Sequence, residues 1–150
     1  MKNILLLLLV NTAVTSFLNG QNVVANDKQR KDIYSLIDEY SQSREKRDTI
    51  LLKNILTRDV DQLVSTGEWR DGIDASVKGM LNSSASSPGT RTLNIEKIRL
   101  LSPDNAIVDC KYEIQNTDGT TRKMWSTFIV VSDHGIWRIS AIRNMLPAGQ

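Results

Sequence analysis

The sequence predicts one α+β domain in which helices pack on one face of an antiparallel sheet. Between residues 27 and 81, apolar side chains recur every three or four positions, as they do along one side of a helix. From residue 93 onward they recur at every second position, as they do along a strand. Residues 116–119 and 133–135 have the composition of tight hairpin turns, which join antiparallel neighbours. Helices followed by hairpin-linked strands are typical of this fold class.

A secretory signal peptide is expected at residues 1–20 of the 150-residue chain. It has a basic start, an unbroken apolar run at residues 4–10, and small or polar residues after that run. The run is too short to span a bilayer core of about 30 Å comfortably, although an N-terminal membrane anchor stays the alternative. The mature protein would then be secreted or periplasmic and free of the membrane, with a polar leader at 21–27 and one domain at 28–147.

Asp27 is expected to cap the first helix, which would follow it, because Asp is favoured at helix N-caps. Residues 41–48 are all polar, and we interpret them as a solvated helix end or a break. The buried side of the helix would consist of Ile33, Leu36, Ile37 and Tyr40.

Two shorter helices are expected next, separated by irregular chain. We interpret residues 59–64 as the exit from the second helix toward a turn at 66–67, and residues 68–72 as a loop. Residues 82–90 are rich in Ser, Pro and Gly, so they are expected to form a flexible connection, with a lid as the alternative. The apolar positions of the two helices are Ile50, Leu51, Ile55 and Leu56, then Ile73, Val77, Met80 and Leu81.

The strands are expected to alternate buried and exposed residues, with one slip and one exception. The slip comes after Leu93 and Ile95 and indicates a β-bulge near residues 96–97. The exception is the strand at 121–132, which carries apolar residues on both faces. Helices can cover one of these faces, and a second copy of the chain is the simplest cover for the other. A homodimer through the sheet face is therefore predicted.

Composition excludes several classes of site. One Cys excludes a disulfide within the chain, and one His excludes a His-pair metal centre, so no metal site and no cofactor are expected. A net charge of +2, without a Lys/Arg run, is too small for a dedicated nucleic-acid binder. Cys110 alternates with apolar residues and is interpreted as a core side chain, whereas His134 lies in a predicted turn.

Three stretches together resemble the SnoaL-like group of the nuclear-transport-factor-2-like superfamily. They are the segment from Asp59 to Gly72 with its Gly-Glu-Trp-Arg core, Arg122 to Thr127 (RKMWST), and Gly135 to Pro147 with its AIRNMLP ending. The resemblance spans residues 28–147. It implies a cone-shaped, curved antiparallel sheet with the N-terminal helices on its concave face, a fold also called cystatin-like. It also implies a pocket between helices and sheet.

The same resemblance directs attention to residues near that pocket. The family includes ketosteroid isomerase, whose Asp base would fall near Val64 or Ser65; neither is a carboxylate, so that reaction is not expected. Asp61 is the candidate acid or base, because burial in an apolar cone would raise the pKa of its carboxyl group. The candidate ligand-binding residues are Tyr40, Gln62, Trp69, Arg70, Trp125 and Arg143.

Structural alternatives accompany these candidates. Arg143 would need a carboxylate partner, Asp61 or Asp109, and such a pair would be a structural ion pair or a ligand clamp. Arg143 and Asn144 point to opposite sides of their strand, so one of the two faces the pocket. The function expected first is an exported domain that binds a small, largely apolar molecule. The alternatives are a lyase, isomerase or hydrolase that uses a pocket carboxylate, and a structural or dimerisation module.

Overall fold

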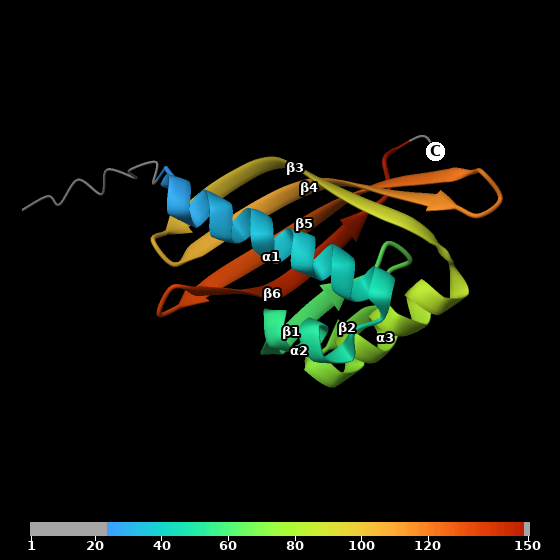
Figure 1. The fold of residues 1–150 in the computed structure, drawn as a ribbon, viewed down its shortest axis with the longest axis horizontal. Helices are drawn as coiled ribbons and strands as arrows, with labels where there is room; N and C mark the ends of the chain where they lie inside the picture. Colours follow the sequence, from blue (N-terminus) through green and yellow to red (C-terminus); the bar gives the residue numbers. More distant parts are fainter. Residues whose placement is uncertain (1–23, 149–150) are drawn as a thin grey trace, which may run out of the picture.

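The computed structural model describes residues 24–148, which form three helices and one six-stranded sheet (Figure 1). The predicted signal peptide lies outside the described residues. None of the described helices is long and apolar enough to cross a membrane. In chain order the elements are α1 (Asp27–Lys46), α2 (Thr49–Ile55), β1 (Leu56–Leu63), β2 (Trp69–Asp71), α3 (Ile73–Ser86), β3 (Gly89–Ser102), β4 (Asn105–Asn116), β5 (Thr121–Asp133) and β6 (Ile136–Met145).

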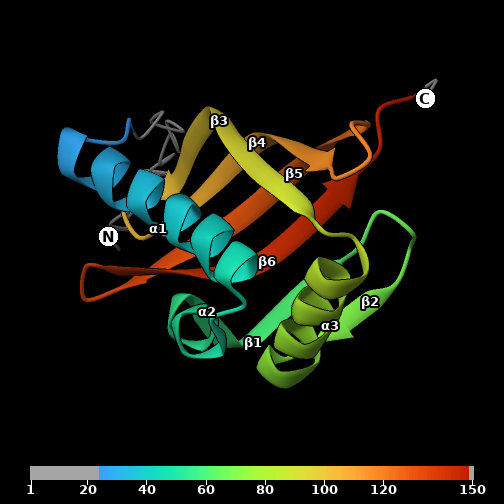
Figure 2. The same ribbon diagram turned by 45° about the vertical axis from the view of Figure 1, so that its right-hand side comes forward.

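The sheet is mixed, with the strand order β2-β1-β6-β5-β4-β3. Strands β3 to β6 form the predicted antiparallel meander, and β1 pairs in parallel with β6 at its edge. All three helices lie on the same side of this curved sheet, which we call the inner face; the opposite side is the outer face (Figure 2). The α+β fold class is therefore confirmed, with the parallel β1–β6 pair as an addition to it.

Helix α1 carries the predicted buried stripe, but its N-cap lies one residue earlier than the predicted Asp27. The cap is Asn26, whose side chain accepts a hydrogen bond from the Gln29 amide, while the Gln29 side chain accepts one from the Asn26 amide. The polar run from residue 41 continues the helix to Lys46, and Arg47 ends it with a left-handed φ of 54°. The predicted stripe is buried throughout, at Ile33, Leu36, Ile37 and Tyr40.

Strands β1 and β2 replace a predicted helix exit and a predicted loop. Leu56, expected to be an apolar position of the second helix, begins β1 instead, and within α2 it is Leu52 rather than Ile50 that is buried. In β1 the residues Leu56, Val60 and Gln62 are buried, whereas polar or charged residues occupy the positions between them. Such a strand lacks a simple apolar alternation, so the sequence pattern did not show it.

Helix α3 is longer than the sequence predicted, because it continues through Ser86 and shortens the expected loop at 82–90 to two residues. The Ser84 hydroxyl donates to the Met80 carbonyl one turn earlier, so this serine is satisfied inside the helix. The bulge expected near residues 96–97 is confirmed by a register shift between Ile95 and Lys97. Both predicted hairpin turns are also present, with positive φ at Gly119 and Gly135.

The core lies between α1 and α2 and the inner face of the central strands. The rings of Tyr40 and Phe128 meet edge to face, with their centroids 5.2 Å apart. Beyond Tyr40, toward the C-terminal end of α1, most of the side chains that line the space between α1, α3 and the sheet are polar. This change from apolar to polar packing positions the site described below.

Candidate functional site

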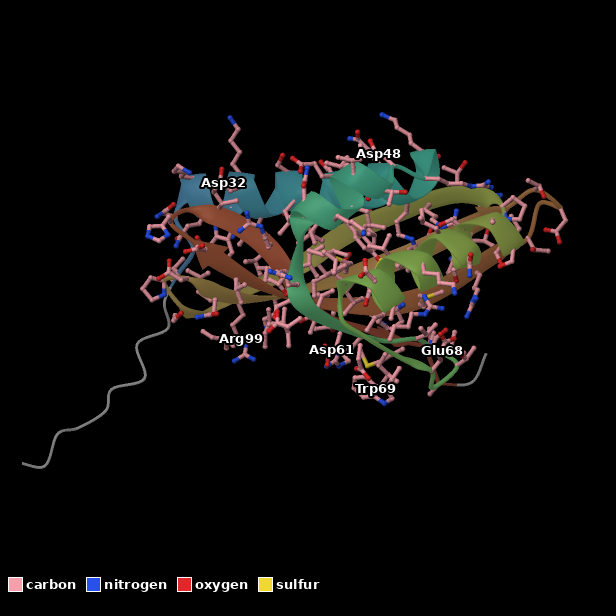
Figure 3. All side chains as sticks on the ribbon, turned by 90° about the horizontal axis from the view of Figure 1, so that it is seen from below. Asp32, Asp48, Asp61, Glu68, Trp69 and Arg99 are labelled. Carbon is pink, nitrogen blue, oxygen red and sulfur yellow. The ribbon has the colours of Figure 1, made fainter. Side chains whose placement is uncertain are left out.

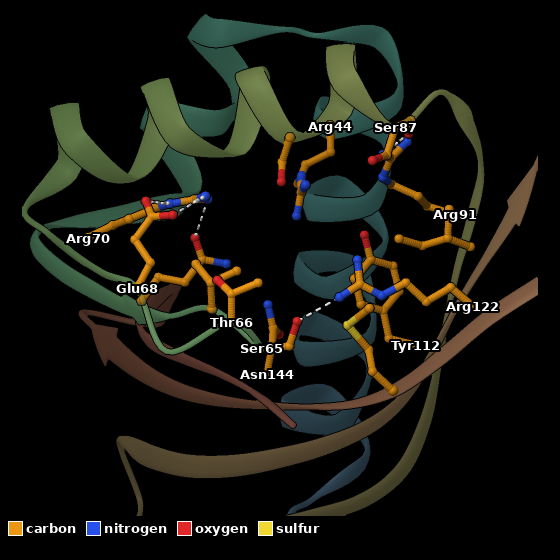
Figure 4. A pocket seen from close by; sticks show the side chains of 15 residues that line it. Arg44, Ser65, Thr66, Glu68, Arg70, Ser87, Arg91, Tyr112, Arg122 and Asn144 are labelled. Atoms are coloured by element: carbon orange, nitrogen blue, oxygen red, sulfur yellow. Dashed lines mark hydrogen bonds and ion pairs between the residues drawn. The ribbon is translucent and has the colours of Figure 1, made fainter. Parts of the chain in front are cut away.

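A cavity of about 190 Å³ opens on the inner face, between the C-terminal end of α1, the end of α3 and the turn at 64–68 (Figure 4). Its apolar wall consists of Val64, Tyr112, Ile114 and Met124. The other lining residues are polar or charged and come from α1, β1, the turn at 64–68, β2, the end of α3 with Ser87 after it, and strands β3, β5 and β6. Four of them are arginines: Arg44, Arg70, Arg91 and Arg122.

Arg44 is held in the cavity wall by neutral oxygens. It is only 5% exposed, and its guanidinium donates to the Tyr40 hydroxyl at 3.0 Å, the Met80 carbonyl at 3.3 Å and the Ser84 hydroxyl at 3.4 Å. Its Nε has no hydrogen-bond partner. Tyr40 therefore stands behind Arg44 rather than in the lining. Burial raises the pKa of Tyr40, so its hydroxyl stays protonated and neutral at ordinary pH.

Arg91 and Arg122 enter the cavity from the starts of β3 and β5. Arg91 is 7% exposed and donates to the Ser87 carbonyl at 2.7 Å and the Gly89 carbonyl at 3.1 Å. Its Nε, like that of Arg44, is without a partner. Arg122 donates to the Ser65 hydroxyl at 2.8 Å and so contacts the turn at 64–68. Within the described part of the chain, neither arginine forms an ion pair with a carboxylate.

Arg70 differs from the other three because it has a counterion. Its Nε lies 2.8 Å from Glu68 Oε1, and its Nη1 donates to Gln62 Oε1 at 3.2 Å. The hydrogen bond from Arg70, followed by its charge, lowers the pKa of Glu68. Gly79 of α3 leaves space for this guanidinium, since a Cβ there would overlap it. The Arg70–Glu68 pair is thus packed across the end of the cavity nearest β2 (Figure 4).

Asp61 and Arg143 meet on the outer face, on the other side of the sheet from the cavity. The guanidinium of Arg143 donates to both carboxylate oxygens of Asp61 at 2.9 Å. The Trp69 ring covers the guanidinium, whose carbon lies 4.8 Å from the ring centroid. Figure 3 shows Asp61 and Trp69 on the side of the molecule away from α1. The structure thus resolves the choice between Arg143 and Asn144, because Asn144 lines the cavity.

Trp125 also lies on the outer face, where the Lys111 ammonium is 5.8 Å from its ring centroid. Of the seven residues predicted from the sequence, Gln62 and Arg70 therefore line the cavity and Tyr40 supports it from behind. The other four lie on the outer face: Asp61, Trp69, Trp125 and Arg143. Sequence reasoning missed Arg44, Arg91, Arg122 and Tyr112, and it left Asn144 as the alternative to Arg143.

Neither the single Cys nor the single His reaches this cavity. Cys110 is fully buried, and burial, followed by the charges of Asp109 and Glu96, raises the pKa of its thiol to about 12. His134 is exposed in the β5–β6 turn, with its Nδ1 2.6 Å from Asp133 Oδ1. Among residues 24–148, no cluster of three or more His, Cys, Asp or Glu side chains could hold a metal ion.

No protein-family model matches the sequence, and no curated protein matches it. Solved structures do match its fold. An NTF2-like protein of unknown function from Shewanella oneidensis is 18% identical, with a TM-score of 0.66 over 77% of this chain and 98% of its own. An NTF2-like protein with a cystatin-like fold from Novosphingobium aromaticivorans is 17% identical, with a TM-score of 0.68 over 81% of this chain and 83% of its own.

A domain of unknown function with a cystatin-like fold from Nostoc punctiforme is 11% identical, with a TM-score of 0.73 over 82% of this chain and 80% of its own. At such identities the likeness concerns the fold alone. The chain therefore has the NTF2-like, or cystatin-like, fold that the sequence predicted.

Proposed function

We propose that this protein binds a small polar molecule in the cavity on the inner face. The observation that carries the proposal is the lining itself, in which buried arginines, an amide and hydroxyl groups point into a space left open between helices and sheet. About 190 Å³ is below the several hundred cubic ångströms of pockets for drug-sized ligands. The lining favours a polar ligand over the largely apolar one expected from the sequence.

The alternative of a carboxylate-dependent enzyme has less support from this geometry. Asp61 is held by Arg143 on the outer face, and the only carboxylate among the described lining residues is that of Glu68. Glu68 is exposed and paired with Arg70, which stabilises its ionised form. The alternative of a purely structural module has less support too, because side chains leave the cavity open.

Two further parts of the proposal rest on the sequence. We propose that the domain is exported, since residues 1–20 have the composition of a signal peptide. Within the NTF2-like fold, we place the chain with the SnoaL-like group. The support for that placement is the Gly-Glu-Trp-Arg segment, the RKMWST segment and the AIRNMLP ending.

The test is a nuclear-magnetic-resonance screen of small polar molecules, neutral and charged, against the protein without its first 20 residues. We expect the shifted amide signals to belong to lining residues such as Gln62, Tyr112 and Asn144. Thr66→Trp places an indole at the mouth of the cavity and is expected to abolish the shifts. The outer-face control Asp61→Asn is expected to leave them unchanged. Shifts confined to the outer face, or binding that Asp61→Asn removes, would contradict the proposal.

A further inference from the structure

We infer that the ligand of this cavity is a small organic acid with at least two anionic oxygen groups, carboxylate or phosphate. This inference rests on the proposed binding function and specifies its chemistry. Three lining guanidinium groups, those of Arg44, Arg91 and Arg122, have no carboxylate partner in the described part of the chain. An arginine is always charged in proteins, so the cavity carries three uncompensated positive charges.

Burial makes two of these charges informative, since Arg122 is exposed whereas Arg44 and Arg91 are buried. Arg44 is 5% exposed and Arg91 is 7% exposed, and a buried charge is costly unless it is paired or fully hydrogen-bonded. Here the partners are neutral oxygens, and in each of the two side chains the Nε has none. A fold-stabilising arginine would be expected to carry a carboxylate beside it, as Arg143 does with Asp61. The missing counterion is what an anionic ligand supplies.

The arrangement also indicates more than one anionic group. Arg91, Arg122 and Tyr112 lie on one side of the cavity and Arg70 lies on the other, with Arg44 between them (Figure 4). Glu68 already neutralises Arg70, which leaves the positive charge concentrated on the Arg44, Arg91 and Arg122 side. A single carboxylate can balance one of these three guanidinium groups. A dianion or trianion would balance two or three of them.

The size of the cavity limits the ligand to a small acid. The volume of about 190 Å³ is smaller than that of pockets for drug-sized ligands, so the ligand has few non-hydrogen atoms. Succinate, citrate and phosphoglycolate are suitable probes, because each carries two or more anionic groups on a short carbon chain. Succinamide keeps the shape of succinate without its charge, and acetate keeps one carboxylate.

The experiment is isothermal titration calorimetry of each probe, supported by thermal melts. We expect at least one of the three polyanions to bind, acetate to bind at least tenfold more weakly, and succinamide to give no heat. At a hundredfold excess over Kd, the melting temperature is expected to rise by about 5–10 °C. Comparing the affinities of succinate and citrate with that of phosphoglycolate distinguishes a carboxylate ligand from a phosphorylated one.

Matched charge-removing variants locate the binding. Arg122→Gln is expected to weaken polyanion binding by about tenfold or more, since it removes a charge-assisted contact. Arg99→Gln removes the same charge from an exposed position on the outer face and is expected to leave binding within twofold. Arg44→Met removes the charge of a buried arginine and tests whether that charge also binds the polyanion. If Arg44→Met does not fold, Arg122→Gln alone tests the role of the arginine charges.

Each result has a defined meaning. If neutral polar molecules bind in the cavity and polyanions bind no better than succinamide, the inference is wrong while the proposed function stands. If no small molecule binds in the cavity, the proposed function fails. Equal losses of affinity in Arg122→Gln and Arg99→Gln would show non-specific charge attraction and would overturn the inference.

Discussion

Arg44 and Arg143 show at the scale of single residues how differently one residue type is used in this fold. Both are held by hydrogen bonds, but Arg143 has the Asp61 carboxylate and Arg44 has neutral oxygens. The sequence predicted that Arg143 needs a carboxylate partner, Asp61 or Asp109, and the structure shows that the partner is Asp61. The sequence did not predict Arg44, which lies in a run of polar residues that looks like a solvated helix end. A buried cationic side chain leaves no signal in a pattern of polarity alone.

Cys110 permits a prediction of pH dependence. The unfolded chain loses its thiol proton near pH 9.0, whereas burial holds the pKa of the folded thiol at about 12. Between these values the unfolded state binds fewer protons, so stability falls as pH rises. The free energy of unfolding of Cys110→Ala should therefore fall less steeply above pH 9 than that of the wild type, by up to about 1.4 kcal/mol per pH unit.

Urea denaturation at pH 8, 9 and 10 measures this difference. Lysines and tyrosines titrate in both proteins, so their contributions cancel in the comparison. Equal slopes in the two proteins would show that the folded thiol ionises as readily as a free one, against the burial seen here.

At the scale of elements, the meander was predictable and the β1–β2 edge was not. Strand β4 alternates fully, because its inward side chains meet an apolar core. In β1 the inward residue Gln62 faces the cavity and is itself polar, so the strand shows no apolar alternation at its most functional position. The residues that make a polar site therefore remove the pattern by which a strand is recognised. The same reason applies to Arg91, which lies near the start of β3 on the inner side and was not predicted.

Two glycines permit a matched prediction about how elements pack. A Cβ at Gly89 would overlap the Gln115 backbone of the neighbouring strand β4, whereas a Cβ at Gly79 would overlap the end of the flexible Arg70 side chain. The backbone cannot move without breaking the β3–β4 ladder. Gly89→Ala is therefore expected to destabilise by about 1–3 kcal/mol, as overpacking does.

Gly79→Ala is the control for that substitution. Arg70 can swing away, and alanine favours the helix by about 1 kcal/mol over glycine, so the unfolding free energy is expected to change little. Urea denaturation compares the two variants. A larger loss in Gly79→Ala than in Gly89→Ala would mean that the Arg70–Glu68 packing matters more to the fold than the β3–β4 pairing.

At the scale of the whole molecule, the helices and the cavity occupy one face of the sheet and leave the other uncovered. Large apolar side chains remain exposed there: Trp125 is 37% exposed and Met145 is 50% exposed, in directly paired positions on β5 and β6. Charges of both signs surround them, including Lys111, Glu96 and Asp109. A surface of mixed charge around an apolar centre can pair with its own copy, in which each positive group meets a negative one.

We therefore propose that the outer face joins two copies of the chain, and sedimentation velocity over a range of concentrations tests it. The wild-type protein is expected to sediment with twice the mass of the chain at high micromolar concentration.

Trp125→Glu places a charge at the centre of the contact and should give monomers, because an unpaired buried charge costs several kcal/mol. Ile136→Glu makes the same kind of change at an exposed position in the distant β5–β6 hairpin and should stay dimeric. A wild type that remains monomeric would contradict the dimer. The inner cavity would still bind its ligand, since every residue of its lining comes from one chain.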